Sequence, residues 1–234
     1  MLFQKTKSPL LSFIAVLPLV LIYEITMFIR FQSETEGIRN GADILLKKLL
    51  SQLGFYGFEA GLVLFLIVFI MVKLLHNVHF HEEDLNYYAI PLMIGEGLLY
   101  ALLIFYVLIH LDIGFLNVLP RDHALNIGYS CGAGVYEELV FRAILMYGFF
   151  QLLQYAGLKK VPGWIGAVIL STALFVGMHY IGEFKYQFEW FTFFVRTTMS
   201  VILSIIFLFR GFAVAAYTHT FYNLSLIYLG GVLL

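Results

Sequence analysis

Long runs of apolar residues recur along the chain and are separated by short polar segments. A helix needs about 20 predominantly apolar residues to cross the hydrocarbon core of a bilayer. The pattern therefore predicts an all-α fold, a polytopic transmembrane helix bundle of about seven spans, or eight if one long segment is broken. The predicted spans are residues 10–29, 54–75, 87–111, 127–155, 163–181, 190–209 and 211–233. We expect these helices to form a single transmembrane domain over residues 1–234.

The first apolar run and one connector have features of their own. Lys5 and Lys7 precede the first run as they would in a signal peptide, but the run is too long for one, so we expect a retained helix. Residues 38–53 mix apolar and basic positions at helical spacing. This segment is expected either to lie in the membrane interface or to cap the bundle as a short amphipathic helix. Basic residues are divided evenly between the two sides of the predicted topology, so the orientation is not predicted.

The composition agrees with a membrane protein and excludes several other classes. Hydrophobic residues make up 61% of the chain and charged residues only 12%, with a net charge of -1. Soluble domains carry roughly a quarter charged residues, so this chain has too few charges to cover an ordinary soluble surface. A disordered chain and a nucleic-acid binder are excluded as well, because the latter needs a basic patch. The single cysteine, Cys131, rules out a disulfide within the chain.

Ionisable residues inside the predicted spans are the exceptions to this composition. Each costs roughly 2.5 to 3.5 kcal/mol at the centre of a membrane helix, so such residues usually face the bundle interior and mark a function. The fourth span carries Glu137, Glu138 and Arg142. At helical spacing Glu138 and Arg142 lie one turn apart and can pair, whereas Glu137 points elsewhere. We therefore predict two carboxylates in two environments, with Glu138 held ionised and Glu137 desolvated and suited to acid–base chemistry.

Two further spans each carry a histidine that shares a helix face with another motif residue, four positions away. Phe175 and His179 share a face of the fifth span, and His219 and Asn223 share a face of the last. A single intramembrane histidine is often only a hydrogen-bonded core residue, but these faces together with Glu137 can form a hydrolytic centre. In it a Glu and a His would take a proton from water, and neutral donors from the other His and the Asn would stabilise the oxyanion.

Other uses of the same residues stay open at this point. Glu and His are also zinc ligands, intramembrane carboxylates can relay protons in a transporter, and a non-catalytic binding or immunity protein could keep these residues as a packing network. Four more ionisable residues inside the spans belong to no motif: Glu24, Glu59, Glu96 and Arg196. The carboxylates are expected to face a water-filled cavity or to form interhelical hydrogen bonds. Arg196 would either neutralise one of them or contact a substrate carboxylate.

The three motifs in this order resemble those of the CPBP family of intramembrane proteases, which includes the CAAX prenyl endopeptidases. The motifs read Glu137-Glu138-x-x-x-Arg142, Phe175-x-x-x-His179 and His219-x-x-x-Asn223. They define an expected catalytic core at residues 128–228. Ala143, where the family often has Gly, is a mild departure from the family pattern.

The resemblance implies a glutamate-dependent intramembrane endopeptidase that hydrolyses a membrane-associated or lipidated peptide or protein. The resemblance implies that Glu137 and His179 activate water. It implies that His219 and Asn223 stabilise the oxyanion, and that Glu138 and Arg142 brace the site. No cofactor and no metal are expected, although the family is also described as metalloproteases, which makes zinc the alternative. The expected partners are membrane lipid and a peptide substrate, without nucleic acid, in a prokaryotic cell membrane.

Overall fold

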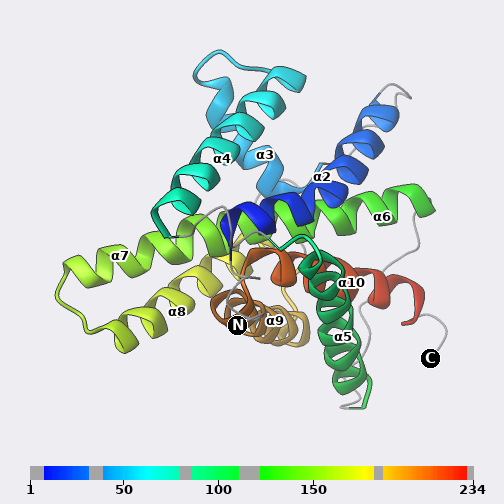
Figure 1. The fold of residues 1–234 in the computed structure, drawn as a ribbon. Coiled ribbons are helices and arrows are strands. Elements are labelled where there is room, and N and C mark those ends of the chain that lie inside the picture. Colours follow the sequence, from blue (N-terminus) through cyan, green and yellow to red (C-terminus); the bar gives the residue numbers. More distant parts are fainter. Residues whose placement is uncertain (1–7, 32–38, 80–85, 111–121, 182–186, 231–234) are drawn as a thin grey trace.

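The regular elements of the described chain are all helices. The computed structural model describes residues 8–31, 39–79, 86–110, 122–181 and 187–230, and these ranges contain no strand. The predicted all-α class is therefore confirmed. The elements in chain order (Figure 1) are α2 (Pro9–Phe31), α3 (Gly41–Ser51), α4 (Gly57–His79), α5 (Ala89–His110), α6 (His123–Gly132), the π-helices η2 (Ala133–Glu137) and η3 (Leu139–Met146), α7 (Tyr147–Tyr155), α8 (Lys160–Met178), α9 (Trp190–Arg210) and α10 (Phe212–Tyr228).

Four of the described helices are long and apolar enough to cross a membrane, judged by length and composition. Their apolar stretches are Pro9–Ile29 in α2, Ala89–Leu108 in α5, Lys160–Met178 in α8 and Trp190–Arg210 in α9. The expected total of seven or eight spans is therefore not confirmed. Helix α10 illustrates the difference, because its 17 residues rise only about 26 Å, less than the roughly 30 Å hydrocarbon core of a bilayer.

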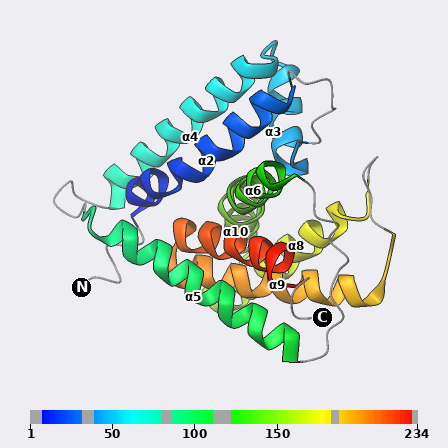
Figure 2. The same ribbon diagram turned by 90° about the vertical axis from the view of Figure 1, so that its right-hand side faces the viewer.

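The segment from α6 to α7 forms one unbroken helix through the middle of the bundle. Figure 1 shows it running across the molecule below α2, and Figure 2 shows α6 nearly end-on with α2, α3 and α10 around it. Helices α2 and α10 pack against α6, α10 also contacts η2, and α8 contacts η3 and α7. The predicted fourth span, residues 127–155, lies within this helix, but its middle is π-helical. Such wide turns are rare and often mark functional sites.

Glycines allow neighbouring helices to approach this central helix closely. A methyl group added at Gly132 would collide with the ring of Tyr23 on α2. One added at Gly134 would lie 2.5 Å from the backbone oxygen of Ala216 on α10. Small residues at helix contacts let membrane helices pack tightly without a hydrophobic driving force between them. The central helix is therefore held in close contact with both α2 and α10.

The connector at residues 38–53 contains helix α3, which begins after the N-cap residue Asn40 and packs against α4 and η2. Its Asp43 is completely buried, whereas Ile44 and Leu49 on the outer side are exposed. The helix thus caps the bundle, which is one of the two expected arrangements, and it also keeps an apolar outer face. This packing brings the start of α3 next to the π-helical part of the central helix.

The last two predicted spans are separate helices because of Gly211. This residue has a φ of 88° and lies between α9 and α10. Side-chain-bearing residues rarely adopt that backbone conformation, whereas glycine adopts it at no steric cost. The chain therefore reverses sharply here, and α10 folds back to contact α9, α5 and the central helix.

Candidate active site

A fully buried ion pair lies on the π-helical part of the central helix. The side chains of Glu138 and Arg142 have no exposed surface, and Glu138 Oε1 lies 3.1 Å from a guanidinium nitrogen of Arg142. The predicted pairing one turn apart is therefore confirmed. Arg142 also donates to the backbone oxygen and the hydroxyl of Ser200 on α9, each at 3.2 Å. A buried charge is stable only when it is paired and hydrogen-bonded. Since Arg142 donates its hydrogen bonds to Ser200, the ion pair links the central helix to α9.

Glu137 has different surroundings from those of the adjacent carboxylate. Its side chain is 14% exposed, and its Oε1 accepts a hydrogen bond from the side-chain amide of Asn40 at 2.7 Å. Its Oε2 lies 3.8 Å from Nε2 of His219. Within the described part of the chain, neither an arginine nor a lysine forms an ion pair with it. The two predicted environments are present: one carboxylate in a fully buried ion pair, the other held by a neutral amide.

His219 of α10 reaches both carboxylates. Its Nδ1 lies 2.8 Å from Glu138 Oε1, and its Nε2 faces Glu137. An ionised carboxylate can only accept a hydrogen bond, so Nδ1 of His219 carries a proton. The neutral ring then presents an unprotonated Nε2 toward Glu137, and only the imidazolium presents an N–H there. This changes the expectation that neutral His219 donates to an oxyanion, because the neutral ring has used its only donor.

His179 caps the end of α8, and its ring orientation is set by the backbone. Its Nδ1 lies 2.8 Å from the carbonyl oxygen of Phe175, which can only accept, so Nδ1 is the protonated nitrogen. The neutral ring therefore has an unprotonated Nε2 that can take a proton. His179 lies within electrostatic range of Glu137 and His219. The Phe175 ring packs on both histidines, with centroids 4.9 Å from His179 and 6.3 Å from His219.

Asn223 and Arg196 lie nearby without a direct contact to the carboxylates. Asn223 is half-buried one turn beyond His219 on the same face of α10, and among the described residues it makes no hydrogen bond with Glu137 or Glu138. Arg196 of α9 lies 5.4 Å from the ring centroid of Tyr180 and is within electrostatic range of His179. Arg196 is therefore beside the candidate site, and its expected contact with a substrate group stays a prediction.

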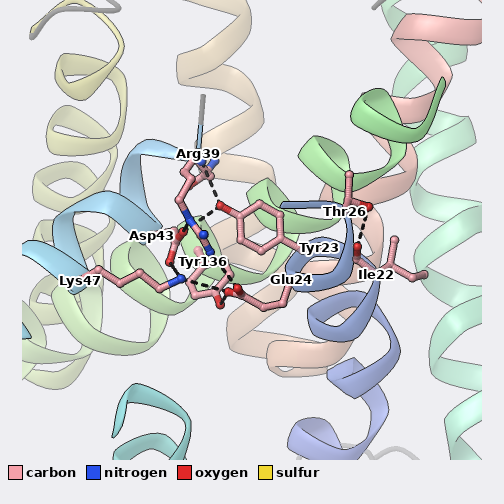
Figure 3. Close-up of polar contacts among 9 residues, drawn as sticks. Ile22, Tyr23, Glu24, Thr26, Arg39, Asp43, Lys47 and Tyr136 are labelled. Carbon is pink, nitrogen blue, oxygen red and sulfur yellow. Dashed lines mark hydrogen bonds and ion pairs between the residues drawn. The ribbon is translucent and has the colours of Figure 1, made fainter. Parts of the chain in front are cut away.

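The intramembrane carboxylates without a motif have partners other than Arg196. Glu96 of α5 pairs with Arg210 at 2.5 Å. Glu24 of α2 pairs with Arg39 at 2.7 Å and with Lys47 at 3.2 Å, as Figure 3 shows. Sequence reasoning placed these three cations in connectors, so it did not identify them as partners. The expected interhelical bonds are thus present for Glu24 and Glu96, whereas Glu59 of α4 is exposed.

The side chains of the candidate site are not arranged as a metal centre. Among the described residues, no group of three or more His, Cys, Asp or Glu side chains could hold a metal ion. Glu138 and His219 instead bond to each other. The expectation of metal-independent chemistry stays a prediction, which chelation can test.

Two residues that contact the site were not identified from the sequence. Asn40 bonds to Glu137 from 97 positions away, and Ser200 bonds to Arg142 from 58 positions away. Asparagine is a preferred N-cap, so the start of a helix at Asn40 could have been predicted from its type. Its contact with Glu137 had no sequence signal, because the contact depends on where α3 packs.

A bundle of apolar helices around a buried carboxylate–histidine centre defines an integral membrane protein with a candidate hydrolytic site. Residues 122–225 match the model of the family described as type II CAAX prenyl endopeptidase Rce1-like. This match supports the assignment to the CAAX protease family that the three motifs predicted, and the matched range contains every predicted site residue. No curated protein and no solved structure was found to match the chain. At the family level, the match implies a membrane-embedded peptidase.

Proposed function

We propose that this chain is an intramembrane endopeptidase in which Glu137 and His179 activate the water that attacks a peptide bond. The observation that carries the proposal is the unequal state of the two adjacent carboxylates. Glu138 is committed to Arg142 and His219, whereas Glu137 has a neutral partner on one oxygen and no hydrogen bond to His219 on the other. A carboxylate that is not committed to an arginine or a lysine is available to accept a proton from water and to return it.

In the proposed reaction, water bound between Glu137 and Nε2 of His179 gives up a proton to one of them as its oxygen attacks the carbonyl carbon. The carbonyl oxygen takes the negative charge of the tetrahedral intermediate. When the carbon–nitrogen bond breaks, the stored proton passes to the leaving nitrogen, which departs as an amine. The other product is a peptide with a new carboxylate terminus. No covalent enzyme intermediate is required, so neither a serine nor a cysteine nucleophile takes part.

Stabilisation of the oxyanion is proposed to come from His219 and Asn223. His219 can donate through Nε2 only as an imidazolium, because Nδ1 already donates to Glu138. In that state the positive charges of His219 and Arg142 balance the negative charges of Glu137 and Glu138, so the buried cluster is neutral overall. Fixed donors in a site of low dielectric stabilise a developing negative charge far more than they would in water.

The substrate is proposed to be a peptide presented at the membrane, and the family description points to one with a prenylated cysteine near its C-terminus. The lipid chain of such a substrate would partition into the bilayer around the apolar helices. The scissile bond would then be held at the depth of the central helix. Two peptides that differ only in the lipid therefore separate proteolysis in general from recognition of a lipidated substrate.

The direct test uses the purified chain in detergent with a farnesylated peptide ending in a C-a-a-X sequence and with its unprenylated twin. Glu137→Gln keeps the size of the side chain but removes the base, so we expect kcat to fall by roughly 10²- to 10⁴-fold. The matched control is Glu59→Gln, because Glu59 is exposed on α4 away from the site. The control should cleave like the unmodified protein. Cleavage by Glu137→Gln at the unmodified rate would refute the proposal.

A further inference from the structure

The side chain of Asn40 joins the start of α3 to Glu137 through both ends of its amide. Its Oδ1 accepts from the backbone N–H of Ala42 at 2.9 Å, which caps α3. Its Nδ2 donates to Glu137 Oε1 at 2.7 Å. The two partners fix the orientation of the amide, because a backbone N–H requires an acceptor and a carboxylate requires a donor. Asn40 is the residue that suits both contacts at once.

A second layer of side chains holds Asn40 in place. The hydroxyl of Tyr23 on α2 accepts from the backbone N–H of Asn40 at 3.1 Å and donates to Asp43 Oδ2 at 2.9 Å. Asp43 is completely buried and pairs with Arg39 at 2.6 Å and with Lys47 at 2.9 Å. Figure 3 shows these groups converging between α2 and α3. The backbone of Asn40 is thus held by a hydrogen-bonded tyrosine that is itself anchored to a buried ion pair.

The same cluster contacts the central helix one residue before Glu137. The hydroxyl of Tyr136 donates to Glu24 Oε1 at 2.6 Å, and Glu24 pairs with Arg39 and Lys47. Burial opposes the charge of Arg39, but the neighbouring carboxylates raise its pKa above the ordinary value, so it stays charged. The cluster therefore has two cations and two carboxylates, and it fixes α2, α3 and η2 relative to one another.

We propose that Asn40 is a positioning residue that orients the carboxylate of Glu137 for attack on the substrate. The inference rests on the proposed function of Glu137 and extends the active centre to the N-terminal part of the chain, outside the range matched by the family. The amide suits this task because it holds one oxygen without adding charge. A lysine or arginine in its place would stabilise the ionised carboxylate and make Glu137 a weaker base.

Asn40 has two roles, capping and positioning, and two substitutions separate them. Asn40→Asp keeps a good N-cap but replaces the amide donor by a second carboxylate beside Glu137. Asn40→Gln keeps an amide donor but is a poor N-cap. If positioning matters, Asn40→Asp lowers kcat roughly 10- to 100-fold, as expected for losing a hydrogen bond to a charged group, with little change in KM. Asn40→Gln then retains more activity than Asn40→Asp.

The pH dependence of cleavage tests positioning separately, because a purely structural role of Asn40 would leave that pH dependence unchanged. In Asn40→Asp, a second carboxylate beside Glu137 opposes its ionisation. The other charged or titratable groups near Glu137 are His219, at 3.8 Å, and Arg142 and His179, which are within electrostatic range. The acidic limb of the profile of kcat/KM for the farnesylated peptide should therefore shift to higher pH in Asn40→Asp. The matched control is Asp122→Ala, which removes the N-cap of α6 about 22 Å along the central helix from Glu137. It should leave the profile unchanged.

The outcomes separate this inference from the function on which it rests. Suppose that Glu137→Gln is inactive while Asn40→Asp keeps the kcat and pH profile of the unmodified protein. Positioning by Asn40 is then refuted and the proposed function stands. An Asn40→Gln variant that is less active than Asn40→Asp refutes positioning in the same way. A stability measurement tests the contact without any cleavage. Asn40→Ala should lower the melting temperature less in a Glu137→Ala background than alone, because the bond is already lost there. Equal decreases would refute the contact.

Discussion

The distance between the central helix and α10 is set at Gly134, and it can be changed by one methyl group. A Cβ at this position would lie 2.5 Å from the backbone oxygen of Ala216 and against the hydroxyl of Thr220. Such contacts are essentially never seen below 3.0 Å, so Gly134→Ala must move the two helices apart by about 0.5 Å or more. The obstacle includes backbone, which cannot rotate away as a flexible side chain could. Overpacking of this kind destabilises a protein by about 1–3 kcal/mol.

The displacement acts directly on the candidate site. Gly134 lies three residues before Glu137, and Ala216 and Thr220 lie on either side of His219 along α10. A shift of about 0.5 Å would stretch the 2.8 Å contact between His219 and Glu138 to near the limit of a hydrogen bond. Because misplacement of catalytic groups by about 1 Å can cost 10²-fold in rate, we expect kcat of Gly134→Ala to fall by roughly 10- to 100-fold.

The control for Gly134→Ala is the same substitution further along the same helix. Nothing lies within 4 Å of a Cβ added at Gly148, so Gly148→Ala should be stabilising by about 0.5–1 kcal/mol through helix propensity alone. Both variants are compared by their melting temperature in detergent and by cleavage of the farnesylated peptide below that temperature. If Gly134→Ala melts and cleaves like Gly148→Ala, the close approach does not position the site and the reasoning fails.

Two further predictions concern the buried ion pair and the question of metal. Glu138→Gln or Arg142→Met alone should lower the free energy of unfolding by about 3–5 kcal/mol, because each leaves a buried group without its partner, while the combined variant should recover most of that loss. Denaturant unfolding measures this, and a combined variant as unstable as the sum of the two would contradict it. Treatment with EDTA should leave cleavage of the farnesylated peptide unchanged, since Glu137 and His179 are proposed to activate water unaided. Activity lost on chelation and restored by zinc would show a metal-dependent reaction.

Several features could be predicted from the sequence because they depend on spacing within one helix. The all-α class follows from the length of the apolar runs, and the Glu138–Arg142 pair follows from their separation by one turn. The different surroundings of Glu137 and Glu138 follow from their different directions around the same helix. The resemblance to the CAAX protease family, which the match over residues 122–225 supports, followed from three such local patterns in order. The π-helical geometry carries no comparable signal, since its residues have ordinary helical types.

Other features depended on how separate helices pack. Counting apolar runs predicted about seven spans, whereas four of the described helices meet the length and composition of a span. Arg196 was a candidate partner for the carboxylates outside the motifs, but Glu96 bonds instead to Arg210, because α9 ends beside α5. The proton positions on the two histidines also required the structure, since each depends on which acceptor lies opposite Nδ1.

The sequence by itself determined that this chain is helical and apolar, and which turns carry carboxylates and histidines. Only the tertiary structure decided that Asn40 meets Glu137 and that His219 lies between two carboxylates. The physical reason is one of range. Backbone hydrogen bonding fixes the angle between residues within a helix, so spacing is enough to place them. Contacts between residues some hundred positions apart depend instead on which small side chains let helices approach, and therefore on the packing of the whole bundle.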